Sequence, residues 1–317
     1  MHIAIVGAGG VGGYFGGRLA AAGARVSFVA RGAHLAALRT RGLTLKSPRG
    51  DAHVARVDAT DDPAAIGRVD VVLYAVKLYD AEAALPALAP LVGADTVVIP
   101  FQNGVDAVDL VTRAVGREHT AGGTCYVAAV IDEPGVIRHT AMDQLIFGEL
   151  DGTRSPRLER FLDACRPAGF QATLSADILV DIWTKFVRLS VFSGMTAATR
   201  SPIGVIARDP ELLAIAIEAV RETTAVARAQ GVKVPETIAE AAGNAFAALP
   251  PQSKSSMLED LERGRRLELP WLSGAVVRIG REVGVPTPTH RFIAAILSPH
   301  VGGTPPASGQ TRAQSSS

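Results

Sequence analysis

The stretch MHIAIVGAGGVGGYFGGRLAAAG, residues 1–23, decides the fold of this chain. Residues 3–6 are continuously apolar, which is typical of a short buried strand. Residues 11–23 have the periodicity of a helix that closes at Gly23. The glycines between the two segments match the pattern GxGxxG, in the order strand, turn and helix. This order predicts the first βα unit of a nucleotide-binding sheet.

The glycine turn is the predicted cofactor site. Glycines allow a tight turn and the close approach of a pyrophosphate, and the helix N-terminus supplies unpaired N–H groups and a positive dipole end. We therefore expect a dinucleotide to bind at Gly7, Gly9, Gly10, Val11 and Gly12. The alternative, a glycine-rich turn without a ligand, is disfavoured by the full context of the motif.

Further apolar strands follow in the first half of the chain. They are expected at residues 25–31, 69–76 and 95–101, with two shorter β segments at 42–46 and 52–58. Helical segments such as 78–91 separate the long strands. This alternation predicts a parallel sheet that is covered by helices on both faces.

The pattern changes from residue 119 onward. Two strands joined by a turn at 133–135 are followed by a helix over 156–167, which Ser155 begins, and by a last strand over 169–174. These elements complete an α/β, Rossmann-type domain that we expect to bind NADP over residues 1–174.

The second half has no strand signals after Ser175. Asp209-Pro210 begins a helix of about 20 residues, and further helices are expected at 235–248, 254–263, 270–284 and 289–297. We therefore expect an all-helical substrate and catalytic domain over residues 175–300. Residues 301–317 are rich in Gly, Pro, Ser and Thr, which predicts a disordered tail.

Composition excludes several classes of function. The formal net charge of +1 gives no electrostatic indication of nucleic acid or of an anionic membrane as a partner. Cys125 and Cys165 lie in apolar segments without ligand spacing, and the histidines form no metal-type pair, so we expect no metal. The N-terminus has no signal-peptide pattern, and no apolar run reaches the ~18 residues of a membrane span. We expect a cytoplasmic protein.

The residues after two strands bear on the cofactor. The strand over 25–31 ends at Arg31 without a nearby acid, and a guanidinium can bind a 2′-phosphate through paired donors. This favours NADP(H); the alternative is that Arg31 is a solvated surface residue. Asn103 follows the strand over 95–101 at the edge where ligands bind, but Asn-Gly is also a common turn.

Lys185 is unusual because it lies within DIWTKFVRLSVFSG, residues 181–194, which reads as a buried helix. The chain has 32 Lys and Arg residues, and only five of them are lysines. A lysine can release a proton that an arginine would keep, so Lys185 could be a proton donor, with Glu268 as a possible acidic partner. A lysine that extends its ammonium into water is the alternative.

Together these motifs resemble the ketopantoate reductase (2-dehydropantoate 2-reductase) family over residues 1–298. The matching segments are GAGGVGGYFGG, Arg31, AVK around Lys77, QNGVD around Asn103, GGTCYVAAVIDEPGVIRH, IWTKF around Lys185, KSSMLEDLERGRRLEL over 254–269 and GVPTPTH over 284–290. The resemblance implies reduction of a 2-oxo acid to a 2-hydroxy acid with NADPH, an N-terminal dinucleotide domain and a helical C-terminal domain. It also makes a homodimer plausible.

The resemblance also assigns roles by motif position. Lys185 matches the catalytic lysine, which protonates the carbonyl oxygen, and Glu268 matches an acid near that lysine and the substrate. Ser256 matches a serine that contacts the substrate carboxylate. Asn103 matches the asparagine at the junction of cofactor and substrate, and Lys77 matches a lysine beside the cofactor.

Three positions depart from the family pattern. Leu189, Ser193 and Ser253 stand where members that make pantoate often have asparagine. Loss of a buried amide weakens recognition of a polar group by about 1–3 kcal/mol. Three functions stay open: reduction of 2-dehydropantoate in pantothenate biosynthesis, the same reaction on a more apolar 2-oxo acid, and a non-catalytic NADP-binding regulatory protein.

Overall fold

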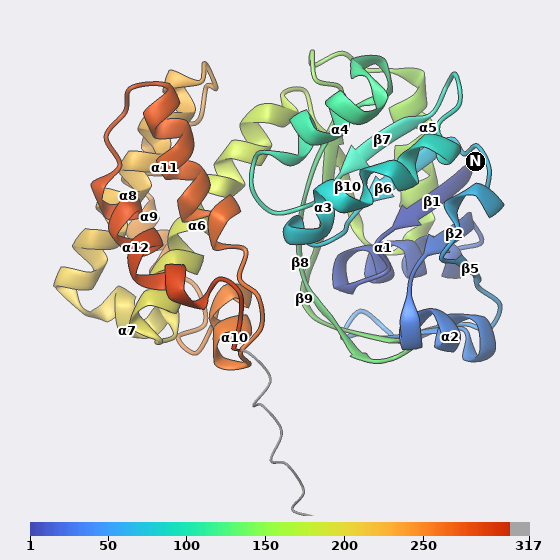
Figure 1. Cartoon of the computed structure of the whole chain (residues 1–317), viewed down its shortest axis with the longest axis horizontal. Coiled ribbons are helices and arrows are strands. Elements are labelled where there is room, and N and C mark those ends of the chain that lie inside the picture. Colours follow the sequence, from blue (N-terminus) through green and yellow to red (C-terminus); the bar gives the residue numbers. More distant parts are fainter. Residues whose placement is uncertain (305–317) are drawn as a thin grey trace, which may run out of the picture. The chain divides into compact units, whose positions relative to one another are not determined.

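The computed structural model describes residues 1–304, apart from the side chain of Glu236 (Figure 1). The chain forms two compact units, which divide between Lys185 and Phe186 inside helix α6 (Ile178–Thr199). The boundary expected near residue 174 coincides with the end of the last strand, Gln171–Leu174. The predicted tail lies outside the described residues, except for residues 301–304.

Within the described residues of the first unit, five parallel strands form one sheet in the order β5-β2-β1-β6-β7. Their bounds are β1 His2–Val6, β2 Arg25–Val29, β5 Asp58–Thr60, β6 Val71–Tyr74 and β7 Val97–Pro100. The register pairs Ile3 with both Val26 and Val71. The parallel sheet predicted from the apolar runs is confirmed.

Alternate residues of the central strand enter two separate cores. Ile3 and Ile5 pack in one core with Phe15 and Leu19 of α1 (Gly10–Ala21). Ala4 and Val6 pack in the other. That second core also contains residues of α3 (Leu78–Ala84) and α4 (Ala107–Val115). A strand buried on both faces has no polar side, which is why these strands read as continuous apolar runs.

The helix expected over 78–91 is divided. α3 ends at Ala84, and a 3₁₀ segment, Leu85–Leu91, continues the chain. Pro86 and Pro90 lie in this segment, and proline lacks the N–H that an α-helical hydrogen bond requires. α2 (Gly32–Arg41) follows β2.

A second sheet has the order β10-β9-β3-β4, and β8 pairs with β9. The long strands β8 (Gly122–Glu133) and β9 (Val136–Gly148) are antiparallel around the predicted turn. The shorter strands are β3 Leu43–Lys46, β4 Ala52–Val54 and β10 Gln171–Leu174. The single β segment expected over 52–58 is wrong, because β4 ends at Val54 and β5 joins the first sheet beside β2.

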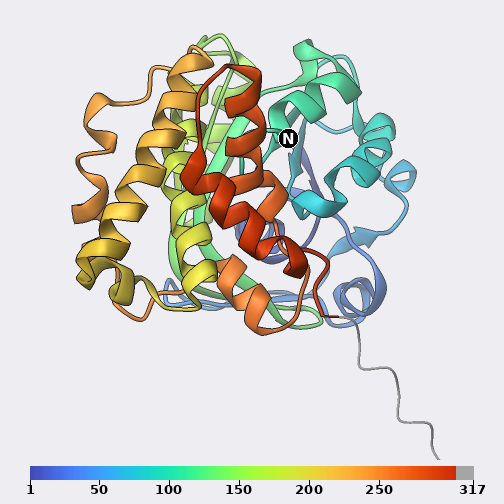
Figure 2. The same cartoon turned by 60° about the vertical axis from the view of Figure 1, so that its left-hand side comes forward.

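α5 (Pro156–Cys165) begins as predicted, because the hydroxyl of Ser155 accepts a hydrogen bond from the N–H of Leu158. The second unit contains only helices and turns within its described residues (Figure 2). Its α-helices after α6 are α7 Ile203–Arg208, α8 Pro210–Ala229, α9 Ala242–Ala247, α10 Ser256–Glu262, α11 Ser273–Glu282 and α12 Pro288–Leu297. The helix expected over 235–248 shortens to α9 and a 3₁₀ turn, Glu236–Ile238.

A buried polar cluster joins α8 to α12. The Glu222 carboxylate accepts hydrogen bonds from the N–H groups of Thr289 and His290, which caps the start of α12. The Nε2 atom of His290 lies 2.8 Å from the Thr223 hydroxyl. Burial lowers the pKa of His290 to about 4, so the ring is neutral near pH 7.

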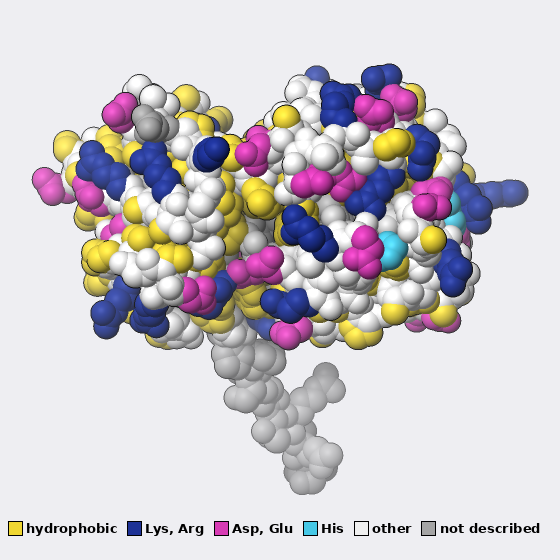
Figure 3. All heavy atoms as spheres, turned by 90° about the horizontal axis from the view of Figure 1, so that it is seen from above, with side chains coloured by type: hydrophobic (Ala, Val, Ile, Leu, Met, Phe, Trp, Pro, Cys, Tyr) yellow, Lys and Arg dark blue, Asp and Glu magenta, His cyan; other side chains and the backbone are white. Residues whose placement is uncertain are grey.

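In the space-filling view, acidic and basic side chains are interspersed over the displayed face (Figure 3). This distribution agrees with the net charge of +1. Among residues 1–304, no helix combines the length and the apolar character that crossing a bilayer requires.

Candidate active site

The glycine turn connects β1 to α1. Gly7 has a φ of +100°, and a Cβ there would lie 2.7 Å from the backbone nitrogen of Val76. A Cβ on Gly10 would overlap the carbonyl oxygen of Ala129 in β8, and one on Gly12 would overlap the carbonyl oxygen of Gly7. These three glycines are therefore required by the fold itself, whatever binds there.

Gly9 is different from its neighbours. It has extended backbone angles (φ −74°, ψ −159°) at the N-cap of α1, and an ideal Cβ would meet nothing within 4 Å. Open space beside the N-terminus of a twelve-residue helix, α1, is what an anionic pyrophosphate needs. No acidic residue lies in the first turn of α1 to occupy this position. The residues present therefore fit a dinucleotide.

The other predicted cofactor residues lie at the same edge of the sheet. Because the strands are parallel, their carboxyl ends meet at one edge, where ligands of such sheets bind. Arg31 follows β2, Lys77 follows β6 and Asn103 follows β7. Arg31 and Lys77 are exposed, and each occupies the N-cap position of a helix, α2 and α3 respectively.

Lys185 lies beside this edge. Its Nζ atom donates a hydrogen bond to Oδ1 of Asn103 at 3.0 Å, and the side chain is half-buried. Nζ also lies 5.7 Å from the ring centroid of Tyr126, within the range of a cation–π interaction. Burial raises the pKa of the neighbouring Cys125 thiol, and the charge of Lys185 opposes that shift. The structure thus brings together two residues that were predicted separately.

This arrangement gives Lys185 a defined position. An ammonium has three N–H donors, and the Asn103 amide oxygen accepts from one of them. Asn103 is neutral, so it orients the ammonium without forming an ion pair. A carbonyl oxygen within reach of the same Nζ atom could receive both a hydrogen bond and a proton.

Leu189 and Ser193 follow Lys185 at i+4 and i+8 on α6, so the three positions share a face of this helix. Leu189 is half-buried, whereas Ser193 is fully buried. The Ser193 hydroxyl has no hydrogen-bond partner among the described residues.

The other predicted substrate residues belong to the helical unit. Ser256 is exposed at the first position of α10, while the preceding Ser255 is buried and caps that helix. The Ser255 hydroxyl also lies 2.7 Å from the hydroxyl of Thr196. Ser253 is half-buried, and Glu268 is buried, with 5% of its surface exposed, just before a 3₁₀ turn.

Tyr126 and His34 were not predicted from the sequence. Tyr126 lies on β8 and contacts Lys185, which is far away in the chain. His34 lies in the first turn of α2 and accepts a hydrogen bond from the N–H of Gly135. The only local signal for His34 is its position three residues after Arg31.

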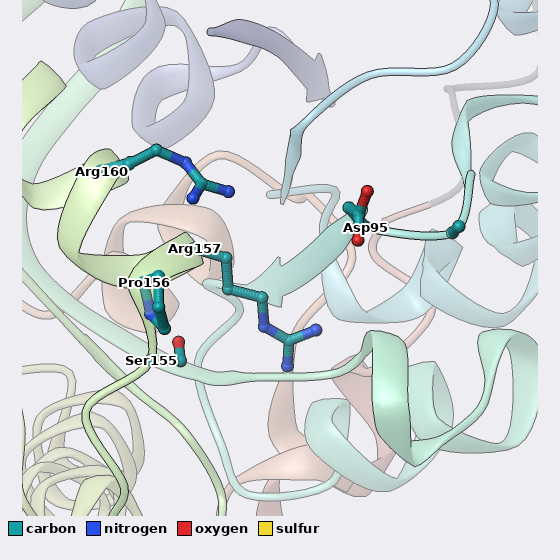
Figure 4. A pocket seen from close by; sticks show the side chains of 6 residues that line it. Asp95, Ser155, Pro156, Arg157 and Arg160 are labelled. Carbon is teal, nitrogen blue, oxygen red and sulfur yellow. The ribbon is translucent and has the colours of Figure 1, made fainter.

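A surface pocket of the first unit contains none of the predicted site residues (Figure 4). Arg157 lines it and makes two hydrogen bonds with the carboxylate of Glu149, at 2.8 and 2.7 Å. This paired arginine has a structural role at the start of α5. Within residues 1–304, no group of three or more His, Cys, Asp or Glu side chains could hold a metal ion.

Comparisons with known proteins agree with this architecture. Residues 3–152 match the family model "Ketopantoate reductase PanE/ApbA", and residues 177–300 match the model of its C-terminal part. A 2-dehydropantoate 2-reductase from Mesorhizobium japonicum is 35% identical, over 94% of this chain and 97% of that protein.

Solved structures give the same result. A PanE/ApbA family ketopantoate reductase from Ralstonia eutropha is 32% identical with a TM-score of 0.87, covering 95% of this chain and 98% of that chain. D-Mandelate dehydrogenase, in a structure with NADH and anilino(oxo)acetate, is 21% identical with a TM-score of 0.86, over 95% of this chain and 98% of that chain, which shows a shared fold alone. The resemblance seen in the sequence is confirmed: this chain belongs to the ketopantoate reductase family, a family of dinucleotide-binding oxidoreductases.

Proposed function

We propose that this chain reduces a 2-oxo acid to a 2-hydroxy acid with NADPH, and that 2-dehydropantoate is its substrate. Pantoate would then be the product, in pantothenate biosynthesis. Family membership supports the reduction of a 2-oxo acid. The observation that carries the proposal is the hydrogen bond from Lys185 to Asn103 at the carboxyl edge of the sheet.

In this proposal residues 1–174 hold the cofactor. The open space at Gly9 and the N-terminus of α1 would receive the pyrophosphate, while Arg31 would bind the 2′-phosphate through its guanidinium. Lys77 would add positive charge beside the cofactor. When bound, NADPH supplies the hydride that reduces the substrate carbonyl carbon.

Lys185 is the proposed proton donor. As negative charge develops on the carbonyl oxygen, the Nζ ammonium stabilises it and then transfers a proton to that oxygen. Asn103 keeps Nζ at a fixed position through the 3.0 Å hydrogen bond. Held in this way, the donor loses little further freedom when the substrate binds.

Residues 175–300 would contribute the substrate contacts. We assign Ser256 to the substrate carboxylate, because it is exposed at the first position of α10. Ser253 precedes it in the same segment. Glu268 is the proposed acid near the lysine and the polar groups of the substrate, and its burial means that a polar partner stabilises it.

A second candidate substrate is a more apolar 2-oxo acid. Leu189 offers a methyl-rich side chain where an asparagine would donate and accept hydrogen bonds. A site of this kind favours apolar groups over hydroxyls, because an unpaired hydroxyl loses its hydrogen bonds to water.

The experiment that tests the proposal is a steady-state assay of the purified protein. NADPH oxidation is followed with 2-dehydropantoate and with a series of branched and aromatic 2-oxo acids, in wild type and in Leu189→Asn. The first candidate predicts the highest kcat/KM for 2-dehydropantoate in the wild type. A higher value for an apolar acid, with a shift toward 2-dehydropantoate in Leu189→Asn, would support the second. No turnover with any 2-oxo acid would contradict both.

We further propose that the protein acts in the cytoplasm as a homodimer. Light scattering of the purified chain measures the molar mass directly. A mass close to the 33.0 kDa of one chain would contradict the dimer.

A further inference from the structure

Tyr126 lies on β8 and joins the β8–β9 hairpin to α6. Successive residues of a strand point to opposite faces, and the preceding Cys125 packs in the core that contains the buried residues of α1. Tyr126 packs elsewhere, against a cluster formed by Ile146, Ile178 and Ile182. Ile146 belongs to β9, whereas Ile178 and Ile182 belong to the first turns of α6. Apolar contacts with a second strand and with a helix therefore hold the ring.

Two glycines let α6 approach the hairpin. Gly122 of β8 pairs with Gly148 of β9. A Cβ on Gly122 would lie 2.8 Å from side-chain carbons of Ile178, and one on Gly148 would lie 3.2 Å from the Cβ of Ile178. Gly122 and Tyr126 are separated by an even number of residues on one strand, so they share a face of it. Larger side chains at the two glycines would keep α6 away from this face.

The face of α6 that meets the hairpin also carries Lys185. Ile178, Ile182 and Lys185 follow one another at i, i+4 and i+7, the spacing of one helix face. The helix rises about 10 Å from Ile178 to Lys185. The strand extends about 13 Å from Gly122 to Tyr126. Because these lengths are similar, the helix that starts beside Gly122 brings Lys185 to Tyr126, and Nζ lies 5.7 Å from the ring centroid.

The ring of Tyr126 attracts the charge of the ammonium. The face of an aromatic ring carries partial negative charge and attracts a cation within about 6 Å of its centroid. This attraction acts on the protonated lysine, which is the form that donates a proton. Lys185 has a flexible stem, so the hydrogen bond to Asn103 alone leaves it several side-chain conformations. The ring restricts them further, and its π face cannot take the proton.

We propose that Tyr126 is a positioning residue for the proton donor: its ring and Asn103 together hold the protonated Lys185 side chain at the carboxyl edge of the sheet. This role rests on the proposed function, because it requires Lys185 to donate a proton to a 2-oxo acid. The positive charge is still on Nζ while it stabilises the negative charge that develops on the substrate oxygen. The attraction of the ring persists through that step, and its loss gives the ammonium more positions to sample.

Ring fluorination separates the charge attraction from the packing of the ring. Fluorine withdraws electron density from the π face and changes the size of the ring little. Tyr126 is replaced by Phe and by phenylalanines that carry one, two or three ring fluorines, and Tyr126→Leu removes the ring. The same fluorinated series at Phe292, which is 65% exposed on α12, is the matched control.

The first measurement is the single-turnover rate with saturating NADPH and 2-oxo acid, together with the Kd of NADPH. Tyr126→Phe stays within about twofold of the wild-type rate, because the ring is kept. Each added fluorine lowers the rate by a similar factor, and Tyr126→Leu is about fivefold slower than Tyr126→Phe. The Kd of NADPH stays within about twofold throughout, since Tyr126 acts through Lys185. The series at Phe292 shows no trend.

The second measurement does not depend on activity. In urea unfolding, Tyr126→Leu changes the unfolding equilibrium constant about two- to fivefold more in the wild type than in Lys185→Met, which lacks the charge. An equal effect in both backgrounds would overturn the attraction between ring and ammonium. If Tyr126→Leu does not fold, the fluorinated series replaces it in this cycle.

The two measurements distinguish the role of Tyr126 from the proposed function. A rate that does not follow ring fluorination, in a wild type that reduces a 2-oxo acid, would overturn only the role of Tyr126. A loss of NADPH affinity that parallels the loss of rate would overturn it as well, because a general disturbance of the site would then explain both. A wild type that turns over no 2-oxo acid would contradict the proposed function, and with it the positioning role.

Discussion

The Nζ atom of Lys185 donates a hydrogen bond of 3.0 Å to the side-chain oxygen of Asn103, across 82 residues of sequence. Asn103 follows strand β7 at the ligand-binding edge of the sheet, whereas Lys185 is on helix α6. The bond orients an ammonium at this edge by means of a neutral partner. In the proposed mechanism, this bond holds the proton donor of an apolar helix at the end of the sheet.

Replacement of Asn103 tests this relationship. Asn103→Ala removes the acceptor that orients Nζ, and we expect kcat to fall by roughly tenfold, the equivalent of one hydrogen bond. The double variant with Lys185→Ala should lose no more activity than Lys185→Ala alone, because both changes act on one unit. Full additivity in this cycle would contradict a coupled role.

Gly9 and Gly10 form a matched pair for the glycine turn. We expect Gly10→Ala to lower the free energy of unfolding by about 3 kcal/mol or more, because its methyl group would overlap the Ala129 carbonyl oxygen. Gly9→Ala should fold with nearly wild-type stability but bind NADPH weakly, because its methyl group enters the space left for the pyrophosphate. Urea titration and NADPH titration measure the two effects, and a reversed pattern would refute this assignment.

Arg31 is the proposed determinant of cofactor choice. Loss of a charge-assisted contact with the 2′-phosphate predicts that Arg31→Ala lowers the preference for NADPH over NADH by about tenfold or more. The ratio of kcat/KM for the two cofactors measures this preference. Arg41→Ala, at another exposed arginine of the same helix, should leave the ratio unchanged. An unaltered ratio in Arg31→Ala would argue for a solvated surface arginine.

His290 makes stability depend on pH. Its pKa is lowered from 6.5 to about 4 by burial, so between these values the unfolded chain binds the proton and the folded chain does not. Stability is therefore lost as the pH falls through this window, by up to roughly 3 kcal/mol. Urea unfolding across this pH range should show a flatter profile for His290→Gln than for wild type. Parallel profiles would contradict this account.

Much of the fold could be predicted because its signals are local. The apolar runs of β1, β6 and β7 follow from burial on both faces, and Asp209 caps α8 as its position before Pro210 predicts. The division between β4 and β5 could not be predicted, because both strands are short and lie close together in the sequence. They differ in their partners: β4 pairs with β3 in the second sheet, whereas β5 pairs with β2 in the first.

The site was predictable in part for the same reason. The residues Gly7, Arg31, Lys77 and Asn103 each follow a strand, so the parallel topology alone places them at one edge. Lys185 approaches Asn103 and Tyr126 through tertiary packing. The local residue pattern of a single sequence does not show which distant residues come into contact. The packing of Gly10 against Ala129 of β8 could not be predicted either, because the sequence does not show which backbone lies beside this glycine.

The single-turnover rate of Lys185→Arg with saturating NADPH and 2-oxo acid tests the central claim most directly. The variant keeps a positive charge but does not release a proton near neutral pH. We predict a rate at least about a hundredfold below wild type, with the Kd of NADPH changed by less than about threefold. A rate close to wild type would show that charge alone suffices and would contradict Lys185 as the proton donor.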